Sequence, residues 1–149
     1  MALENENIKC LYLLNKFLKQ LSIPILVVDD EVDWIFNLKH FLNKKGFNLV
    51  SFTDPLLAFE HLKYNHRNYS LILTDLSMPN ISGIELANKV RKELNSSIII
   101  FLMTAFDISD LKNKFDIQPA KIERIIQKPL KLSNLINMIN QTLQQQQQQ

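Results

Sequence analysis

The sequence of 149 residues contains a single cysteine, Cys10. One cysteine excludes an internal disulfide and a metal site built from several thiolates, so a reducing compartment, the cytoplasm, is the expected location. A secretory signal is also lacking, because Glu4 and Glu6 stand where such a signal has basic residues. Lys16 and Lys19 then interrupt the apolar stretch that follows. We therefore expect that the chain is not secreted.

Neither a membrane nor a nucleic acid is the expected partner. The apolar run Ser96–Phe106 is shorter than the roughly 20 residues that cross a bilayer, and the uncharged stretch after Leu132 is interrupted by polar residues. The chain has 17 Lys and Arg residues against 15 Asp and Glu residues, a net charge of only +2. Nucleic-acid binding needs clustered basic residues that displace counterions from phosphates, and here the charge is dispersed.

The hydrophobic content is 46%, which suits one globular domain with a substantial core. Ahead of that domain, apolar residues recur at helical spacing and predict an amphipathic helix over residues 5–20, before Pro24. We assign residues 1–22 to this preceding helix. Its leucine-rich face could cover the chain's own domain or a second copy of the chain, so a homodimer is one of two alternatives.

Short apolar runs then alternate with segments of helical period. The predicted strands are Ile25–Val28, Leu49–Phe52, Leu71–Leu73, Ile98–Met103 and Ile122–Ile126. The predicted helices are Glu31–Lys45, a helix that starts at Asp54 and Pro55, Ile84–Leu94, Asp107–Phe115 and Lys131–Leu143. Strands that are apolar on both faces and alternate with helices predict a doubly wound α/β domain, with a five-stranded parallel sheet covered on both faces. The run Gln144–Gln149 is expected to be a frayed polyglutamine tail.

Polar side chains follow four of the predicted strands at the point where each strand ends. In chain order they are Asp29 and Asp30, Asp75, Thr104, and Lys128. The carboxyl ends of parallel strands meet at one edge of a sheet, and ligands of open α/β sheets bind at that edge. We therefore expect these side chains to share one rim.

Three carboxylates at one place repel one another unless a cation lies among them. Their oxygens suit Mg²⁺, which keeps open positions that a phosphate can occupy. A carboxylate beside such an ion can attack phosphorus to form an aspartyl phosphate, so Asp75 is the candidate nucleophile. Lys128 can stabilise the equatorial oxygens, and Thr104 can donate its hydroxyl to one of them. Each residue also has an ordinary alternative, because Asp29, Asp30 and Thr104 could cap helices. Lys128 could lie in a plain loop.

The order of these residues resembles the receiver domains of two-component response regulators. Residues 25–31, Ile-Leu-Val-Val-Asp-Asp-Glu, are similar to the family's acidic opening. Residues 73–83, Leu-Thr-Asp-Leu-Ser-Met-Pro-Asn-Ile-Ser-Gly, match its phosphoacceptor segment. Met-Thr-Ala at 103–105 and Lys-Pro at 128–129 complete the pattern in order. The resemblance extends to Leu143, and we place the receiver domain at residues 23–143.

The resemblance implies a flavodoxin-like sheet with strand order 2-1-3-4-5. It implies that Asp75 is the phosphoacceptor, contacted through its phosphoryl group by Thr104 and Lys128. The implied Mg²⁺ ligands are Asp29, Asp30, Asp75 and the backbone carbonyl of Ser77. A sensor histidine kinase or a phosphotransfer protein would donate the phosphoryl group, and the modified domain would change its affinity for an unidentified protein target.

The sequence departs from the family pattern at position 125. An aromatic residue is usual there, and this chain has Ile125, which is stiff at χ1 and lacks a flat ring. We therefore expect a weaker response around the fifth strand, with coupling through the loop after Thr104.

Two other functions stand as alternatives to a signalling domain that is not an enzyme. A haloacid-dehalogenase-like phosphohydrolase also uses a strand-end aspartate with Mg²⁺. Such enzymes have a second aspartate two residues after the nucleophile, where this chain has Ser77. The other alternative is a receiver fold that serves only as a constitutive binding module, and the intact acidic cluster argues against it.

Overall fold

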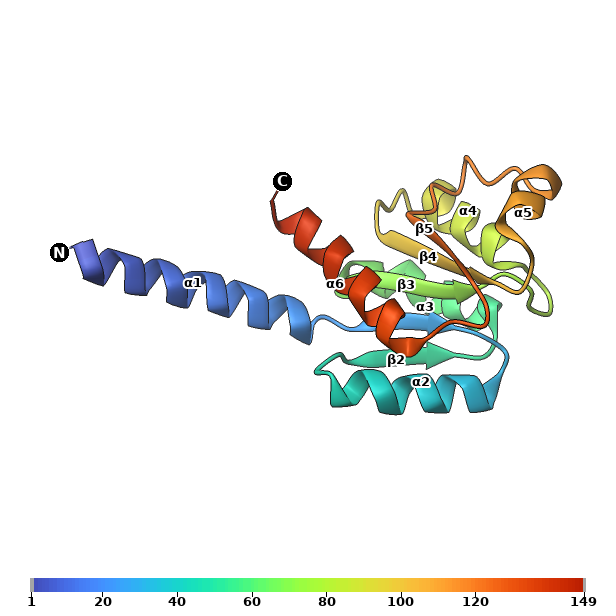
Figure 1. Ribbon diagram of the computed structural model, residues 1–149. Helices are drawn as coiled ribbons and strands as arrows, with labels where there is room; N and C mark the ends of the chain where they lie inside the picture. The colour runs from blue at the N-terminus through green and yellow to red at the C-terminus, as the bar shows by residue number, and fades with distance from the viewer. Residues whose placement is uncertain (1, 149) are drawn as a thin grey trace.

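The structure is a computed structural model that describes residues 2–148, with the side chains of all of these except residues 17, 19–22 and 147 (Figure 1). Strands and helices alternate after a long N-terminal helix. The strands are β1 (Ile25–Val28), β2 (Leu49–Phe52), β3 (Leu71–Asp75), β4 (Ile99–Thr104) and β5 (Arg124–Gln127). The helices are α1 (Ala2–Ser22), α2 (Val32–Lys44), α3 (Pro55–Asn65), the short 3-10 helix η1 (His66–Asn68), α4 (Gly83–Glu93), α5 (Ile108–Lys114) and α6 (Leu132–Gln147).

The five strands form one parallel sheet in the order β2-β1-β3-β4-β5. This confirms the predicted doubly wound α/β fold and the strand order that the resemblance implied. Every residue of β1, β3 and β4 is buried, as expected for strands covered on both faces. Val28 pairs with Thr74, and Asp75 pairs with Met103. The strands therefore end nearly level, at one edge of the sheet.

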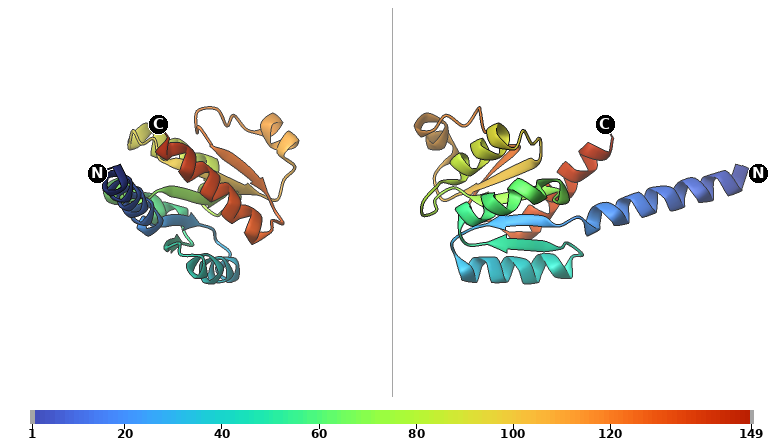
Figure 2. Two further views of the ribbon diagram at one scale, coloured as in Figure 1. Left: turned by 60° about the vertical axis from the view of Figure 1, so that its left-hand side comes forward. Right: turned by 180° about the vertical axis from the view of Figure 1, so that it is seen from behind.

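Two apolar cores lie on opposite faces of the sheet. Helices α2 and α6 cover one face, and α3, α4 and α5 cover the other (Figure 2). The first core includes Ile35, Leu38 and Leu42 of α2 with Leu135 and Ile139 of α6. The second includes Phe59 and Leu62 of α3, Leu86 and Val90 of α4, and Leu111 of α5. Among residues 2–148, none of these helices has the length and apolar character required to span a membrane.

The predicted elements are present, with differences at their ends. Helix α1 is longer than the predicted 5–20. The largest difference is at the C-terminus, where α6 continues past the predicted end at Leu143 to Gln147. The expectation of a frayed tail from Gln144 onward is therefore wrong for this part of the run. Glutamine is a good helix former, and a helix that is already nucleated adds further residues at little cost.

Helix α4 begins directly against the end of β3. The backbone amide of Gly83 donates a hydrogen bond to the carbonyl of Leu76 at 2.9 Å. A Cβ atom at Gly83 would overlap the backbone oxygen of Asp75 and would lie 2.8 Å from Cδ1 of Leu102. The absence of a side chain thus lets the loop after β3 return close to Asp75.

Replacement of Gly83 by alanine is expected to lower the free energy of unfolding by about 2 kcal/mol, because the added methyl group overpacks a rigid backbone contact. Urea unfolding followed by circular dichroism measures this loss. Gly46→Asn is the control, because Gly46 has φ +88° and nothing within 4 Å of its Cβ position. Asparagine tolerates positive φ, so the control should lose little stability. Equal stability of Gly83→Ala and the wild type would contradict the packing argument.

Candidate functional site

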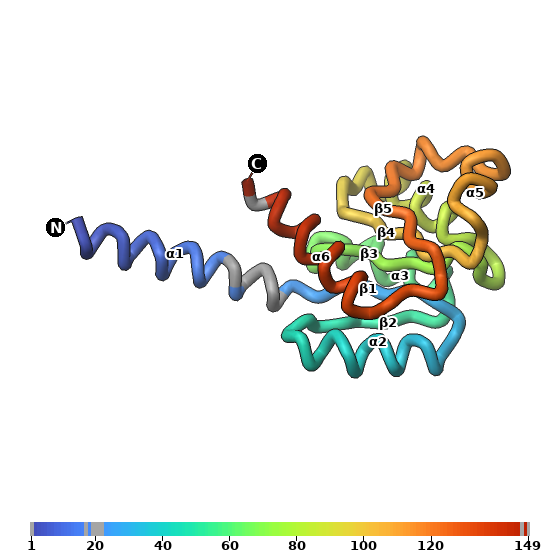
Figure 3. Tube along the Cα trace, in the orientation of Figure 1, coloured from blue at the N-terminus to red at the C-terminus, as the bar shows by residue number. Residues whose placement is uncertain are grey.

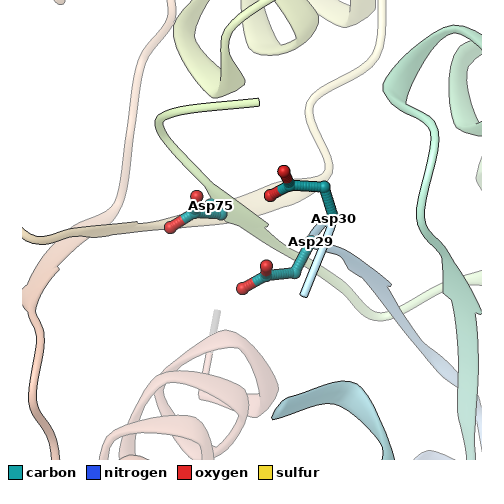
Figure 4. A group of neighbouring side chains, drawn as sticks. All are labelled: Asp29, Asp30 and Asp75. Carbon is teal, nitrogen blue, oxygen red and sulfur yellow. The ribbon is translucent and has the colours of Figure 1, made fainter. Parts of the chain in front are cut away.

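The side chains that were predicted to share one rim lie together at the carboxyl edge of the sheet. Asp29 and Asp30 follow β1, Asp75 ends β3, Thr104 ends β4, and Lys128 follows β5. Figure 4 shows the carboxylates of Asp29, Asp30 and Asp75 gathered at the ends of β1 and β3. Their ligand oxygens lie within 4.8 Å of one another. The sheet therefore unites residues that are far apart in the sequence.

Lys128 joins two of these carboxylates. Its Nζ donates to Oδ2 of Asp29 at 3.0 Å and lies 3.0 Å from Oδ1 of Asp75. Its backbone amide donates to the carbonyl of Thr104 at 2.7 Å, which fixes the end of β5 against β4. The ring of Trp34, on the first turn of α2, lies 5.5 Å from the same Nζ, a cation–π distance. The ammonium is thus held between β1, β3 and α2, so Lys128 lies in a loop and also takes part in the rim.

Burial and charge act against each other at this ion pair. Burial raises the pKa of Asp75 above its ordinary value, and the negative charges of Asp29 and Asp30 raise it further, against the opposing effect of Lys128. Burial lowers the pKa of Lys128, but the hydrogen bonds to Asp29 and Asp75, together with the negative charges of both groups, outweigh burial and leave that pKa raised. Lys128 therefore stays charged, whereas the anionic form of Asp75 is less stable than that of an ordinary aspartate.

The rim fits a divalent cation. Three carboxylates face one ammonium, so negative charge is in excess. Asp30 is exposed to solvent, which leaves room for the waters that Mg²⁺ keeps in its coordination shell. Ser77, whose carbonyl is the fourth implied ligand, lies two residues after Asp75 in the loop toward α4, with its side chain exposed. The donor set of hard oxygens is the one that Mg²⁺ prefers.

The hydroxyl of Thr104 is buried at the end of β4 and links the rim to the next loop. Its Oγ1 accepts a hydrogen bond from the backbone amide of Phe106 at 3.0 Å. The hydroxyl still has its own hydrogen to donate to another group. The N-cap residue of α5 is Asp107, whose side chain accepts from the amide of Ser109. The alternative in which Thr104 caps that helix is therefore wrong.

Asp29 combines two roles that the sequence left as alternatives. Its Oδ1 accepts from the backbone amide of Glu31 at 3.0 Å, while its Oδ2 accepts from Lys128. Glu31 is the N-cap of α2 and makes no side-chain capping bond. The carboxylate of Asp29 thus satisfies one amide at the helix entrance and also takes part in the rim.

The backbone around Asp75 is fixed by buried hydrogen bonds. The hydroxyl of Thr74 donates to the carbonyl of Asp75 at 3.0 Å. The amide of Leu76 donates to the carbonyl of Met103 at 2.8 Å, which continues the pairing of β3 and β4 one residue past the strand. Asp75 is therefore carried by a rigid segment, as a positioned nucleophile requires.

Comparison with known proteins decides the family. A profile of the response regulator receiver domain matches residues 25–140. The chain belongs to the receiver domain family of two-component systems. The response regulator receiver protein CpdR of Brucella abortus is 31% identical over 119 residues, which cover 80% of this chain and 95% of that protein. The aligned region therefore covers nearly the whole of that relative.

Other relatives are much longer proteins. The sensor protein EvgS of Escherichia coli K12 is 37% identical over 84 residues, 56% of this receiver and 7% of EvgS. The sensor kinase/phosphatase LuxQ of Vibrio cholerae is 29% identical over 114 residues, 76% of this receiver and 13% of LuxQ. The chain therefore spans only a small part of these sensors.

Solved receiver structures show the same fold. The CheY-like receiver of Methanospirillum hungatei superposes with a TM-score of 0.74 at 20% identity, covering 85% of this chain and 98% of that one. The receiver of the Francisella response regulator 1452 gives a TM-score of 0.73 at 25% identity, covering 84% and 99%. The aligned region in both cases includes most of the receiver and its parallel sheet.

Two contacts at the rim were not predicted from the sequence. These are the Trp34 ring near the ammonium of Lys128 and the Phe106 amide bound to Thr104. An aromatic residue one helical turn after Asp30 was the one available signal for the first contact. The second uses a backbone amide, which no residue type reveals.

Mg²⁺ is expected to raise the melting temperature, because an ion that binds only the folded rim stabilises it by mass action. At ten times the dissociation constant the stabilisation is about 1.4 kcal/mol, or about 4 °C for a domain of this size. Asp30→Asn should reduce the shift. Without Mg²⁺, the same variant should melt above the wild type, because one repulsive charge is gone.

Asp33→Asn provides the matched control for this titration. Asp33 carries the same charge in the first turn of α2 but lies outside the cluster of three carboxylates. It should keep the full response to Mg²⁺, measured by differential scanning fluorimetry. A wild-type melting curve that ignores Mg²⁺, or a control as impaired as Asp30→Asn, would argue against a metal at this rim.

Proposed function

We propose that this receiver accepts a phosphoryl group on Asp75, with Mg²⁺ at the rim, from a histidine kinase or a phosphotransfer protein in the cytoplasm. Modification then changes its affinity for a protein target. The observation that carries the proposal is the ammonium of Lys128, 3.0 Å from Oδ1 of Asp75. A fixed positive charge at this distance can bind an oxygen of a phosphoryl group attached to Asp75. A dehalogenase-type hydrolase gains no support, because Ser77 replaces its second aspartate.

Each residue has a separate part in the transfer. An oxygen of Asp75 attacks phosphorus, the bond between phosphorus and the donor's histidine nitrogen breaks, and the electron pair stays on that nitrogen, which takes a proton from water. Lys128 binds one phosphoryl oxygen, and the hydroxyl of Thr104 donates to another. When bound, Mg²⁺ supplies positive charge to the remaining oxygen. The groups that would hold it are Asp29, Asp30, Asp75 and the carbonyl of Ser77.

Incubation with acetyl phosphate and Mg²⁺ is expected to add one phosphoryl group to the chain, and Asp75→Asn should abolish the addition. The reason is that the ammonium of Lys128 lies 3.0 Å from Oδ1 of Asp75, at the end of a strand fixed by buried hydrogen bonds. Intact-mass spectrometry after short incubation measures the product. Asp116→Asn, at an exposed aspartate on the loop after α5, is the control and should be modified like the wild type.

Lys128→Ala separates metal binding from the response to phosphorylation. It should leave the Mg²⁺ response largely intact, since no metal ligand is removed. The variant should show a weaker response to phosphorylation, because it lacks the ammonium that would bind the phosphoryl oxygens. Modification that persists in Asp75→Ala would show that another residue is the acceptor.

The output of the site is proposed to run through the loop after β4. A Thr104 hydroxyl that turns toward a phosphoryl oxygen weakens its bond to the Phe106 amide. Phe106 in turn contacts α5, because Nζ of Lys114 lies 5.2 Å from its ring centre. Ile125, at the usual aromatic position, is half-buried on β5 and packs against the second core. A population shift needs different contacts in the two states, and a stiff aliphatic side chain offers few.

Hydrogen exchange with and without beryllofluoride and Mg²⁺ tests this route. The amides of residues 104–115 are expected to change protection more than those of residues 122–126, because the Thr104 contact reports to the loop and α5. Thr104→Ala should bind beryllofluoride but lose most of the change at 105–115. A dominant change around Ile125 that disappears only on its replacement would show aromatic-style coupling in spite of the substitution.

The donor protein is proposed to cover the start of α2. A donor histidine must reach Asp75, so its surface must lie over the rim. Val32 and Phe36 are one turn apart on α2, immediately after the acidic segment, and expose 65% and 72% of their area. Exposed apolar side chains beside a reactive centre are typical of a docking surface.

Phe36→Ala is expected to slow transfer from a histidine-phosphotransfer donor by about tenfold, the effect of losing one well-packed apolar contact. Labelling by acetyl phosphate, which needs no docking, should not change. Tyr64→Ala is the control, because Tyr64 is 86% exposed and lies on α3, away from the rim. Radiolabel transfer assays on all three proteins measure the rates. Equal loss with both donors would place the defect in the site itself.

A further inference from the structure

Helix α1 leaves the receiver at the edge of the sheet opposite the rim. Ile23 and Pro24 alone separate it from β1, whose other end is followed by Asp29. Figures 1 and 3 show α1 extending away from the sheet. Every α1 side chain that the structure describes is exposed. Most helical stability in proteins comes from the packing of an apolar face, so we expect α1, with 21 residues, to have a partner surface.

Most apolar side chains of α1 lie in a stripe along one side of the helix, and Ile8, Tyr12 and Leu13 lie outside it. Successive residues of a helix are turned by about 100°, which places Leu3 and Leu14 at the centre of the stripe. The neighbouring apolar side chains of the stripe that the structure describes are Cys10, Leu11 and Leu18. Leu3 and Leu14 expose 77% and 50% of their area. The basic side chains of Lys9 and Lys16 project from the opposite side of the helix.

Among the described residues, both apolar faces of the sheet are already covered by other helices. Helices α2 and α6 cover one face of the sheet, and α3, α4 and α5 cover the other. The stripe must therefore be covered by another molecule, and its self-complementary form suits a second copy.

We propose that α1 forms a parallel two-stranded coiled coil with α1 of a second copy of this chain. Leu3, Asn7, Cys10 and Leu14 follow the alternating spacing of four and three residues that marks such a seam, and the sequence continues it at positions 17 and 21. Asn7 then lies at an a position, where a pair of asparagines favours two parallel strands in register. In an antiparallel pair Asn7 would face an apolar residue.

The size and charge of the helix agree with this occupant. Three heptads give a seam about 30 Å long, and two such helices bury on the order of 1,000 Å², the lower range of specific interfaces. Glu4 and Glu6 flank the seam, and Lys9 and Lys16 lie outside it. The dimer therefore brings no charge into its core. The parallel dimer holds both receivers at the same end of the coiled coil and leaves both rims accessible to other molecules.

Sedimentation of the full chain over a range from micromolar to submillimolar concentration tests the dimer. The wild type should sediment as a dimer at the upper end, and Leu14→Glu, at the centre of the stripe, should sediment as a monomer throughout. Tyr12→Glu introduces the same charge on the opposite side of α1 and should remain dimeric. Melting of the receiver should be unchanged in both variants, which separates association from folding.

Oxidative cross-linking tests the parallel orientation, because Cys10 is the sole cysteine. Cys10 lies at a d position, where two copies face each other in a parallel pair, and should form a disulfide-linked dimer. Leu3→Cys in a Cys10→Ser background should also cross-link. Lys16→Cys in that background, off the seam, should not.

Three outcomes would overturn the proposal. The first is a wild type that stays monomeric at submillimolar concentration. The second is a dimer that Leu14→Glu does not weaken, which would place the interface elsewhere on the chain. The third is a dimer in which Leu3→Cys fails to cross-link, because antiparallel helices would hold these residues about 27 Å apart along the axis.

Discussion

The ammonium of Lys128 between the carboxylates of Asp29 and Asp75 is the interaction on which the rim depends. Two like charges about 5 Å apart repel by about 3 kcal/mol at an effective dielectric constant of 20, and three acidic side chains meet here. Lys128 and Asp29 are 99 residues apart in the sequence. Strand β5 is also separated from β3 by β4, so the long lysine side chain spans the intervening strand. The site therefore exists only when the whole sheet is assembled.

Even with this ion pair, the rim carries more negative than positive charge, because three carboxylates face one ammonium. Burial raises the pKa of Asp75, and Asp29 and Asp30 add to that effect, so one ammonium does not restore the ordinary acidity of the group. A neutral residue at any of these positions would relieve repulsion. Folding stability alone thus favours a less acidic rim, and the cluster is explained by the cation and the phosphoryl group that it is suited to bind.

The sequence predicted the fold and the candidate site to different depths. The strands and the meeting of Asp29, Asp75, Thr104 and Lys128 followed from apolar runs that end in polar residues, because a parallel sheet aligns its carboxyl ends. The strand order followed only from the resemblance to receiver domains. The distances from Lys128 to both carboxylates did not follow, since they depend on side-chain reach across β4. The amide of Phe106 and the ring of Trp34 are contacts between separate elements, and local sequence patterns do not encode them. The end of α6 was missed because glutamine is neutral toward packing yet favours helix.

The two ends of β1 lead to the two features on which our proposals rest, the rim and helix α1. Its carboxyl end leads into the acidic segment, and its amino end receives α1 through Ile23 and Pro24. All four residues of β1 are fully buried and paired with β2 and β3. Such a strand cannot slide between two positions without breaking both pairings and both cores, so it is a poor path for a conformational signal. Coupling to a target is better carried by the loop after β4, which has exposed side chains and a single hydrogen bond to Thr104. A dimer through α1 would therefore act by holding two receivers near each other, which raises the local concentration of rims for a shared partner without altering either one.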